Sequence, residues 1–161
     1  MKKALPWIGL LARLILGGVL LVAGYLKAFS PDKSMMAVRA YEMLPVSVAN
    51  FIGIVLPFAE MFMGLLLILG AGIRVMGILS ALLMLIFVIG ISQAWARGLS
   101  IDCGCFGGGG KVAPGEANYL LPLVRDAGLA ALGIYLFIYP RSKFALDRTS
   151  SDSTNATEKD M

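Results

Sequence analysis

Four long apolar runs constrain this chain more than any other feature of its sequence. They cover residues 7–29, 48–70, 73–96 and 118–139, and each is long enough to cross a bilayer, which takes about 20 residues of helix. Hydrophobic residues make up 58% of the chain and charged residues 15%, against about 25% charged in an average soluble domain. We therefore expect an all-α polytopic membrane protein, a bundle of four transmembrane helices over residues 1–143, with the lipid bilayer as its environment.

The two ends of the chain carry separate expectations. The first run follows two lysines, as a signal peptide would, but it continues unbroken to Phe29, beyond an apolar signal region of about 7–15 residues. We expect a retained helix. Residues 144–161 are rich in Ser, Thr and Asp and predict a disordered cytoplasmic tail. The net charge of +4 forms no continuous basic patch outside this tail, which argues against nucleic acid as a partner.

The basic residues near the ends of the spans predict an orientation. One side would carry Lys2, Lys3, Arg74, Arg141, Lys143 and Arg148, and the other Lys27, Lys33, Arg39, Arg97 and Lys111. Cytoplasmic loops are enriched in Lys and Arg, and acidic residues count little. We therefore expect both termini in the cytoplasm and the loop between the last two spans outside the cell membrane.

The connections between spans predict local packing. Residues 33–43 are expected to form a short interfacial helix with Met35, Met36, Val38 and Tyr41 on its apolar side. The turn at residues 70–72 is so short that the second and third spans should form an antiparallel hairpin. Small residues, among them Ala127 and Ala131 spaced four apart, predict faces on which membrane helices approach closely.

The loop between the third and fourth spans contains the sequence Asp102-Cys103-Gly104-Cys105-Phe106-Gly107, followed by three further glycines. These are the only two cysteines of the chain. A disulfide that closes so small a ring adds little stability, and strained, exposed disulfides tend to be the oxidising ones. Gly104 permits the bend that a bridge between Cys103 and Cys105 would need. Thiol–disulfide exchange is the interpretation that this pattern favours, with the glycines either letting the loop move or serving as a linker.

Two other interpretations of the cysteine pair stay open. The pair would be a passive disulfide or two idle thiols, or it would bind a metal. Zinc takes four ligands, usually Cys and His, whereas this chain has no histidine and only Asp102 beside the pair. We therefore expect no intramolecular metal site, although a Cu(I) ion shared with a partner would suit two thiolates.

Ionisable residues inside the spans are functional candidates by default. Counting about 1.5 Å per residue places Arg13 roughly 9 Å and Glu60 roughly 12 Å from the inner membrane edge. The sequence thus predicts an Arg13–Glu60 ion pair, structural or functional. Nearer the outer surface, a polar pocket would be lined by Lys27, Tyr41, Gln93, Arg125 and Asp126.

That second cluster has two interpretations. Lys27, Gln93 and Arg125 would hold the head group of a membrane quinone, or the cluster would orient the cysteine loop. Lys27 by itself is more typical of a side chain that snorkels to the lipid headgroups.

Several of these segments resemble a known family. Arg13–Gly17, Ala23–Lys27 and Pro31 are similar to the first helix of the DoxX-like membrane proteins, and Leu56-Pro57 through Glu60 to Gly64 and Gly70 to the second. Arg97-Gly98 and the Cys-Gly-Cys-Phe-Gly loop resemble the MauE branch of methylamine-utilisation proteins, and Arg125-Asp126 fits the start of its fourth helix.

The resemblance implies a four-helix membrane protein tied to redox maturation of exported proteins. In the methylamine system, the family is linked to processing, transport or maturation of the methylamine dehydrogenase beta subunit. The main hypothesis is a thiol–disulfide component in which Cys103 and Cys105 exchange with an extracytoplasmic thioredoxin-fold partner or exported client. A self-contained relay would need two cysteine pairs, and this chain has one. The alternative is a non-catalytic transporter or assembly factor that uses the Arg13/Glu60 polar site.

Overall fold

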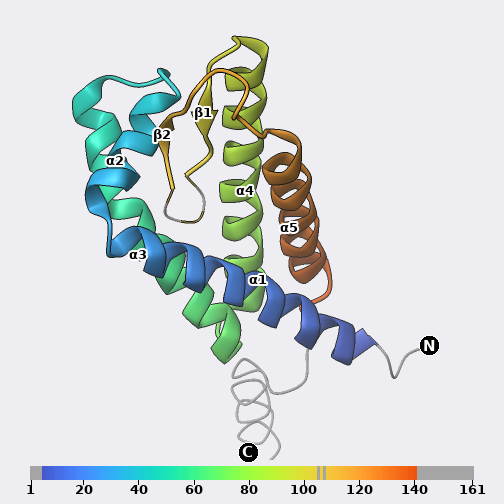
Figure 1. Ribbon diagram of the computed structural model, residues 1–161. Helices are drawn as coiled ribbons and strands as arrows, with labels where there is room; N and C mark the ends of the chain where they lie inside the picture. The colour runs from blue at the N-terminus through green and yellow to red at the C-terminus, as the bar shows by residue number, and fades with distance from the viewer. Residues whose placement is uncertain (1–4, 105, 107, 141–161) are drawn as a thin grey trace, which may run out of the picture.

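Five helices and one two-stranded hairpin make up the part of the chain that the computed structural model describes, residues 5–104, 106 and 108–140 (Figure 1). In chain order the elements are α1 (Leu5–Ala28), α2 (Pro31–Ala40), α3 (Val46–Leu69), α4 (Ile73–Ala96), β1 (Ile101–Asp102), β2 (Gly110–Lys111) and α5 (Leu120–Ile138). The helices α1, α3, α4 and α5 are each long and apolar enough to span a membrane. The expected all-α polytopic class is confirmed. Residues 144–161, expected to be a disordered tail, lie outside the described residues.

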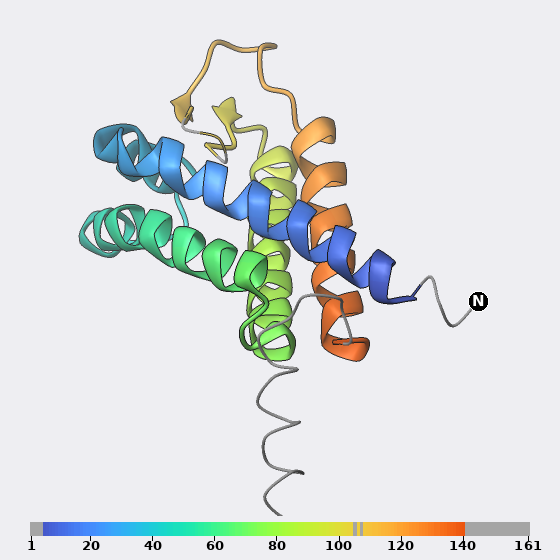
Figure 2. The ribbon, with the colours of Figure 1, turned by 90° about the horizontal axis from the view of Figure 1, so that it is seen from below.

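The four long helices are arranged as two pairs that cross obliquely. Helix α1 packs along α3, and α4 packs along α5, as both ribbon views show (Figures 1 and 2). Helices α3 and α4 are joined by a tight turn at Gly70-Ala71-Gly72, yet they diverge from it and contact each other little. The expected short connection between these two spans is present, but they do not pack along each other as a hairpin, because each of them packs closely on a different partner.

Small residues decide which helices pair. A Cβ atom built on Gly17 would lie 2.9 Å from the Gly64 carbonyl oxygen, and one on Gly77 would lie 3.0 Å from the Gly133 carbonyl oxygen. Each contact brings two backbones together, as small residues allow in membranes. The expected small-residue pair in α5, Ala127 and Ala131, is exposed instead. The two alanines do have the predicted spacing, but they are not on the face that packs on α4. That face contains Gly133, two residues after Ala131.

Helix α2 is held against α3 by a hydrogen bond to a backbone carbonyl of α3. That carbonyl is available because a proline in α3 cannot donate to it. Pro57 lacks an N–H group, so the carbonyl of Gly53, four residues earlier, loses its helical partner. The Ser34 hydroxyl donates to that oxygen at 2.7 Å. The buried side of α2 consists of Ser34, Ala37 and Ala40. The structure thus places small residues on the packing face of α2, rather than the methionine side expected from hydropathy.

The cysteine loop is built on a short antiparallel hairpin. Ile101 pairs with Lys111 and Asp102 with Gly110, and the hairpin lies between α2 and α4 in Figure 1. At the base of the loop, the Tyr119 hydroxyl donates to the Leu99 carbonyl, and the Tyr119 ring stacks on Trp95. These contacts fasten both ends of the loop to the bundle.

Candidate functional site

The cysteine loop is packed against α2 through its glycines. A Cβ atom on Gly104 or on Gly109 would lie 2.4 Å from the Ala37 Cβ atom, and both glycines have positive φ angles of 68° and 141°. Only glycine combines that conformation with so close an approach. The described glycines of the loop are therefore part of a fitted contact, which favours a positioned loop over a free linker.

Tyr41, the residue that follows α2, holds the loop at the first cysteine. Its hydroxyl donates to the Cys103 carbonyl at 3.1 Å. Its own carbonyl accepts from Gln93 Nε2 at 3.0 Å and from the Arg97 guanidinium at 3.3 Å. Tyr41 thus joins α2, the end of α4 and the cysteine loop. Cys105, the second predicted redox residue, lies outside the described residues.

Glu42 adds an ionic contact on the exposed side of this junction. Its carboxylate lies 2.9 Å from Lys111 Nζ and 3.6 Å from the Arg97 guanidinium. The hydrogen bond and charge of Lys111 hold the pKa of the Glu42 carboxyl below its usual value, and Arg97 adds to the effect. Glu42 also has a φ angle of 51°, a left-handed conformation that is uncommon outside glycine.

We expect the Glu42 contact to order the loop in a pH-dependent way. A carboxyl whose pKa is lowered on folding stabilises the folded state at any pH above its pKa in the unfolded chain. This stabilisation is lost as the pH falls through the lower pKa of the folded state. Hydrogen–deuterium exchange of residues 100–112 should therefore be slower in the wild type than in Glu42→Gln at neutral pH. The difference should shrink below about pH 4.5, the usual value for this carboxyl. A difference that persists unchanged in acid would contradict this prediction.

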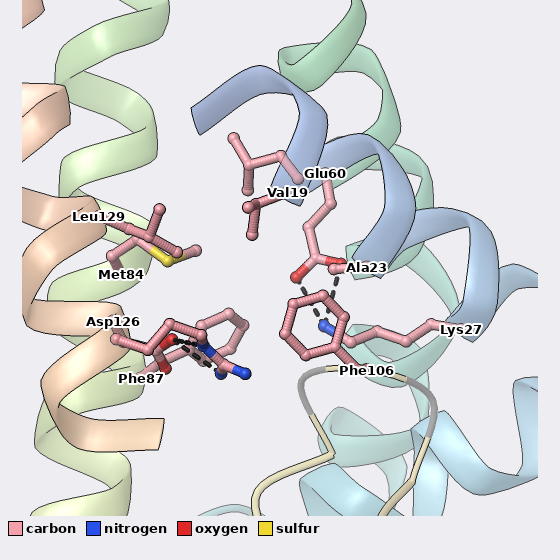
Figure 3. A pocket seen from close by; sticks show the side chains of 11 residues that line it. Val19, Ala23, Lys27, Glu60, Met84, Phe87, Phe106, Asp126 and Leu129 are labelled. Atoms are coloured by element: carbon pink, nitrogen blue, oxygen red, sulfur yellow. Dashed lines mark hydrogen bonds and ion pairs between the residues drawn. The ribbon is translucent and has the colours of Figure 1, made fainter. Parts of the chain in front are cut away.

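Beneath the loop, Lys27 and Glu60 form a buried ion pair (Figure 3). Lys27 Nζ lies 2.7 Å and 3.0 Å from the two Glu60 carboxylate oxygens, and the side chains are only 4% and 1% exposed. Lys27 thus turns into the bundle and does not snorkel to the surface. The predicted Arg13–Glu60 ion pair was therefore wrong, because Glu60 pairs with Lys27. Arg13 is buried elsewhere on α1.

The direction of side chains on antiparallel helices explains this choice. Gly17 packs against Gly64 and Gly24 against Pro57. Continuing that register leaves Lys27 about 9 Å from Glu60 along the axis and Arg13 about 12 Å away on the other side. Side chains tilt toward the N-terminus of their own helix. Lys27 and Glu60 therefore converge, whereas Arg13 and Glu60 point apart.

A second ion pair lies across from the first and contacts the loop. Arg125 lies 2.8 Å from the Asp126 carboxylate, which is 2% exposed. The Arg125 guanidinium also stacks over the Phe106 ring, 4.6 Å from its centroid. In Figure 3 the labelled Phe106 side chain reaches from the loop toward the Lys27–Glu60 pair. Phe106, one residue after Cys105, therefore couples the loop to the buried charges.

The two ion pairs and Phe106 line one small cavity. Lys27, Glu60, Phe106, Arg125 and Asp126 share it with apolar side chains, and its volume is about 10 Å³. A space of that size holds about one water molecule. Of the three residues predicted to hold a quinone, the structure brings Lys27 and Arg125 together here. Gln93 instead lies at the Tyr41 junction.

Three residues that shape this site have no role predicted from the sequence. Phe106 belongs to the cysteine motif, and its place beside a cysteine is the one signal that could have identified it. Glu42 gave no signal, because nothing in the sequence reveals its left-handed backbone or its pairing with Lys111. Phe87, which stands 5.2 Å from Lys27 Nζ by its ring centroid, was indistinguishable from the other apolar residues of its span.

These features define a multi-pass membrane protein whose cysteine-bearing loop is fastened over two ion pairs. The family model described as "Methylamine utilisation protein MauE" matches residues 5–139. The chain therefore belongs to the MauE family. No curated protein and no solved structure gives a significant match to it.

Proposed function

We propose that this MauE-family protein is a membrane thiol–disulfide component that supports disulfide formation in exported proteins. A thiolate of a client or of a thioredoxin-fold carrier attacks a disulfide between Cys103 and Cys105 and forms a mixed disulfide. The second thiol of the partner then resolves it. Two electrons and two protons pass from the partner dithiol to the loop, so the partner leaves oxidised and Cys103 and Cys105 become thiols.

The observation that carries this proposal is the seating of Cys103. Gly104 packs against Ala37 in a conformation that favours glycine, and the Tyr41 hydroxyl binds the Cys103 carbonyl. Such contacts hold a reactive group in a defined position, as exchange with a partner requires. Cys103 is half-buried in a glycine-rich loop, and in the proposed orientation a partner would approach it from the aqueous side.

The proposed orientation places both termini in the cytoplasm and the loop outside. Disulfides persist in extracytoplasmic compartments, which suits this chemistry. The burial of Lys27 in an ion pair supports the same orientation, because Lys27 then no longer counts among the basic residues of the outer side. The excess of Lys and Arg on the terminal side grows accordingly.

The test is disulfide formation in an exported reporter protein, in cells that depend on this chain for it. We expect the variant Cys103→Ser/Cys105→Ser to leave the reporter reduced, at the level of cells without the protein. Ser100→Ala, a change in the same loop, should oxidise the reporter like the wild type. Membrane abundance of each variant is measured alongside. If the double cysteine variant oxidises the reporter normally, the proposal fails.

Thiol labelling of intact cells tests the orientation and the redox state. A membrane-impermeant maleimide should label the cysteine pair only after a reductant is added, because we propose that the pair is external and oxidised at rest. Labelling without reduction would mean free external thiols and would favour a reductase. Labelling that needs permeabilised cells would invert the orientation and remove the main support for an oxidising role.

The alternative, a non-catalytic transporter or assembly factor, makes the opposite prediction for the cysteines. It expects Glu60→Gln to abolish function and the double cysteine variant to retain it. Two observations weigh against it. Glu60 pairs with Lys27 rather than completing a site with Arg13, and the cavity at Glu60 has room for about one water molecule.

A further inference from the structure

A larger cavity shares the Phe87 side chain with the small cavity at the two ion pairs. It is an apolar groove of about 350 Å³ between α2, α3 and α4, walled by Tyr41, Ile52, Leu83 and Phe87 among others. It lies where α3 and α4 diverge from their short turn, and Val38 of α2 and the residues that follow this helix complete its wall. Pockets for small organic ligands have volumes of about 300–1,000 Å³, so the groove is of ligand size.

The mouth of the groove is apolar and exposed. Ile86 and Ile89 line it and are 63% and 61% exposed on the outer face of α4, within a span that crosses the membrane. A ligand therefore reaches the groove sideways, from the lipid. That route suits a molecule with a long hydrocarbon tail and excludes a charged, water-soluble one.

Two aromatic residues line the groove, and one of them contacts the cysteine loop. They are Tyr41 and Phe87; aromatic rings pack well on other flat rings. Behind Phe87 stands the Lys27 ammonium, 5.2 Å from the ring centroid. The Tyr41 hydroxyl binds the Cys103 carbonyl. One tyrosine side chain therefore separates the groove from the backbone of the first cysteine.

We propose that this groove binds a membrane quinone, with its ring between Tyr41 and Phe87 and its isoprenoid tail leaving past Ile86 into the lipid. The proposal rests on the proposed thiol–disulfide function, since each exchange leaves Cys103 and Cys105 as thiols. Their reoxidation forms the S–S bond and releases two electrons and two protons. The quinone accepts both electrons and both protons and becomes a quinol. This site differs from the pocket around Lys27 and Arg125 that the sequence suggested.

Photolabelling of the purified full-length protein in lipid nanodiscs tests the site directly. An azido-substituted short-chain ubiquinone is photolysed with the protein, and the labelled peptides are mapped by mass spectrometry. We expect label on α4 around residues 83–90 and on α2 near Tyr41, and we expect excess unlabelled ubiquinone to displace it. Label confined to Phe106 and Arg125 would place the quinone in the other cavity and overturn the proposal.

Two tryptophan substitutions on α3 provide a matched pair. Ile52→Trp fills the groove, whereas Ile54→Trp places the same side chain two residues away, at a position that is 47% exposed and does not line the groove. Overfilling should weaken labelling about tenfold in Ile52→Trp and leave Ile54→Trp unchanged. An azido fatty acid serves as the control ligand. If it labels the same residues and competes with the quinone equally, the groove is an ordinary lipid site and the proposal is wrong.

Binding is measured in a redox-inactive Cys103→Ser/Cys105→Ser background as well, so that failure of this inference and failure of the proposed function can be told apart. If the cysteines are required for reporter oxidation but no quinone label appears, the function stands and the groove assignment fails. If the label appears but the cysteines are dispensable in cells, the groove binds quinone and the proposed exchange chemistry fails.

Discussion

Substituting Gln for Glu60 should lower the free energy of unfolding by about 3–5 kcal/mol, the usual cost of removing one partner from a buried ion pair. The Lys27 ammonium is bound by both Glu60 carboxylate oxygens and is 4% exposed, so the substitution would leave a buried basic group without its carboxylate partner. Unfolding by sodium dodecyl sulfate in mixed micelles, followed by circular dichroism, measures the change. A loss below about 1 kcal/mol would place this pair in the range of exposed ones.

The double variant Lys27→Met/Glu60→Leu separates stability from function. Replacing a buried pair by apolar residues of similar volume is often neutral or stabilising, so we expect the double variant to recover most of the stability that Glu60→Gln loses. Reporter oxidation is then measured with a protein that is folded. Normal oxidation would assign the pair a structural role, and lost oxidation in a stable protein would show that the charges take part in function.

The second large effect is expected at Gly24. Its added Cβ atom in Gly24→Ala would lie 2.5 Å from the Pro57 carbonyl oxygen and 2.9 Å from the Met61 amide nitrogen. Backbone atoms cannot yield as a flexible side chain does, so α1 and α3 must separate. Overpacking of this kind costs about 1–3 kcal/mol, and here the Lys27–Glu60 contact would be stretched as well.

Gly18→Ala is the matched control on the same helix. A Cβ atom on Gly18 meets no atom within 4 Å among the described residues. Alanine also favours helix over glycine by up to about 1 kcal/mol, so stability should be unchanged or slightly higher. Both variants are compared by the same unfolding titration. Equal stabilities would mean that α1 and α3 do not pack as closely as the structure describes.

Hydropathy alone predicted the membrane-spanning helices, because a bilayer demands long apolar segments whatever their neighbours are. The observed helices α1, α3, α4 and α5 begin and end within about two residues of the predicted runs, a margin usual for helix ends. The position of the cysteine loop was equally predictable from the sequence. It lies between the last two spans, and its composition is unlike that of the rest of the chain.

The pairing of side chains between different helices was not predictable in the same way. Counting depth from the ends of two helices ignores their relative shift and the tilt of their side chains, and it therefore matched Glu60 with Arg13. The role of Pro57 was not predictable either, because it depends on a contact between two helices. Pro57 frees the Gly53 carbonyl, which then binds a hydroxyl on α2. A carbonyl released in one helix says nothing about which distant residue will bind it.

The sequence by itself thus determined the number of spans, the class of fold and the place of Cys103 and Cys105, since each depends on local composition. Only the tertiary structure decided that Lys27 binds Glu60, that Tyr41 holds the Cys103 carbonyl and that Phe106 caps the buried charges. Those contacts depend on helix register and on the direction of side chains across an interface. Both are set by close packing between segments far apart in the chain, which no local pattern encodes.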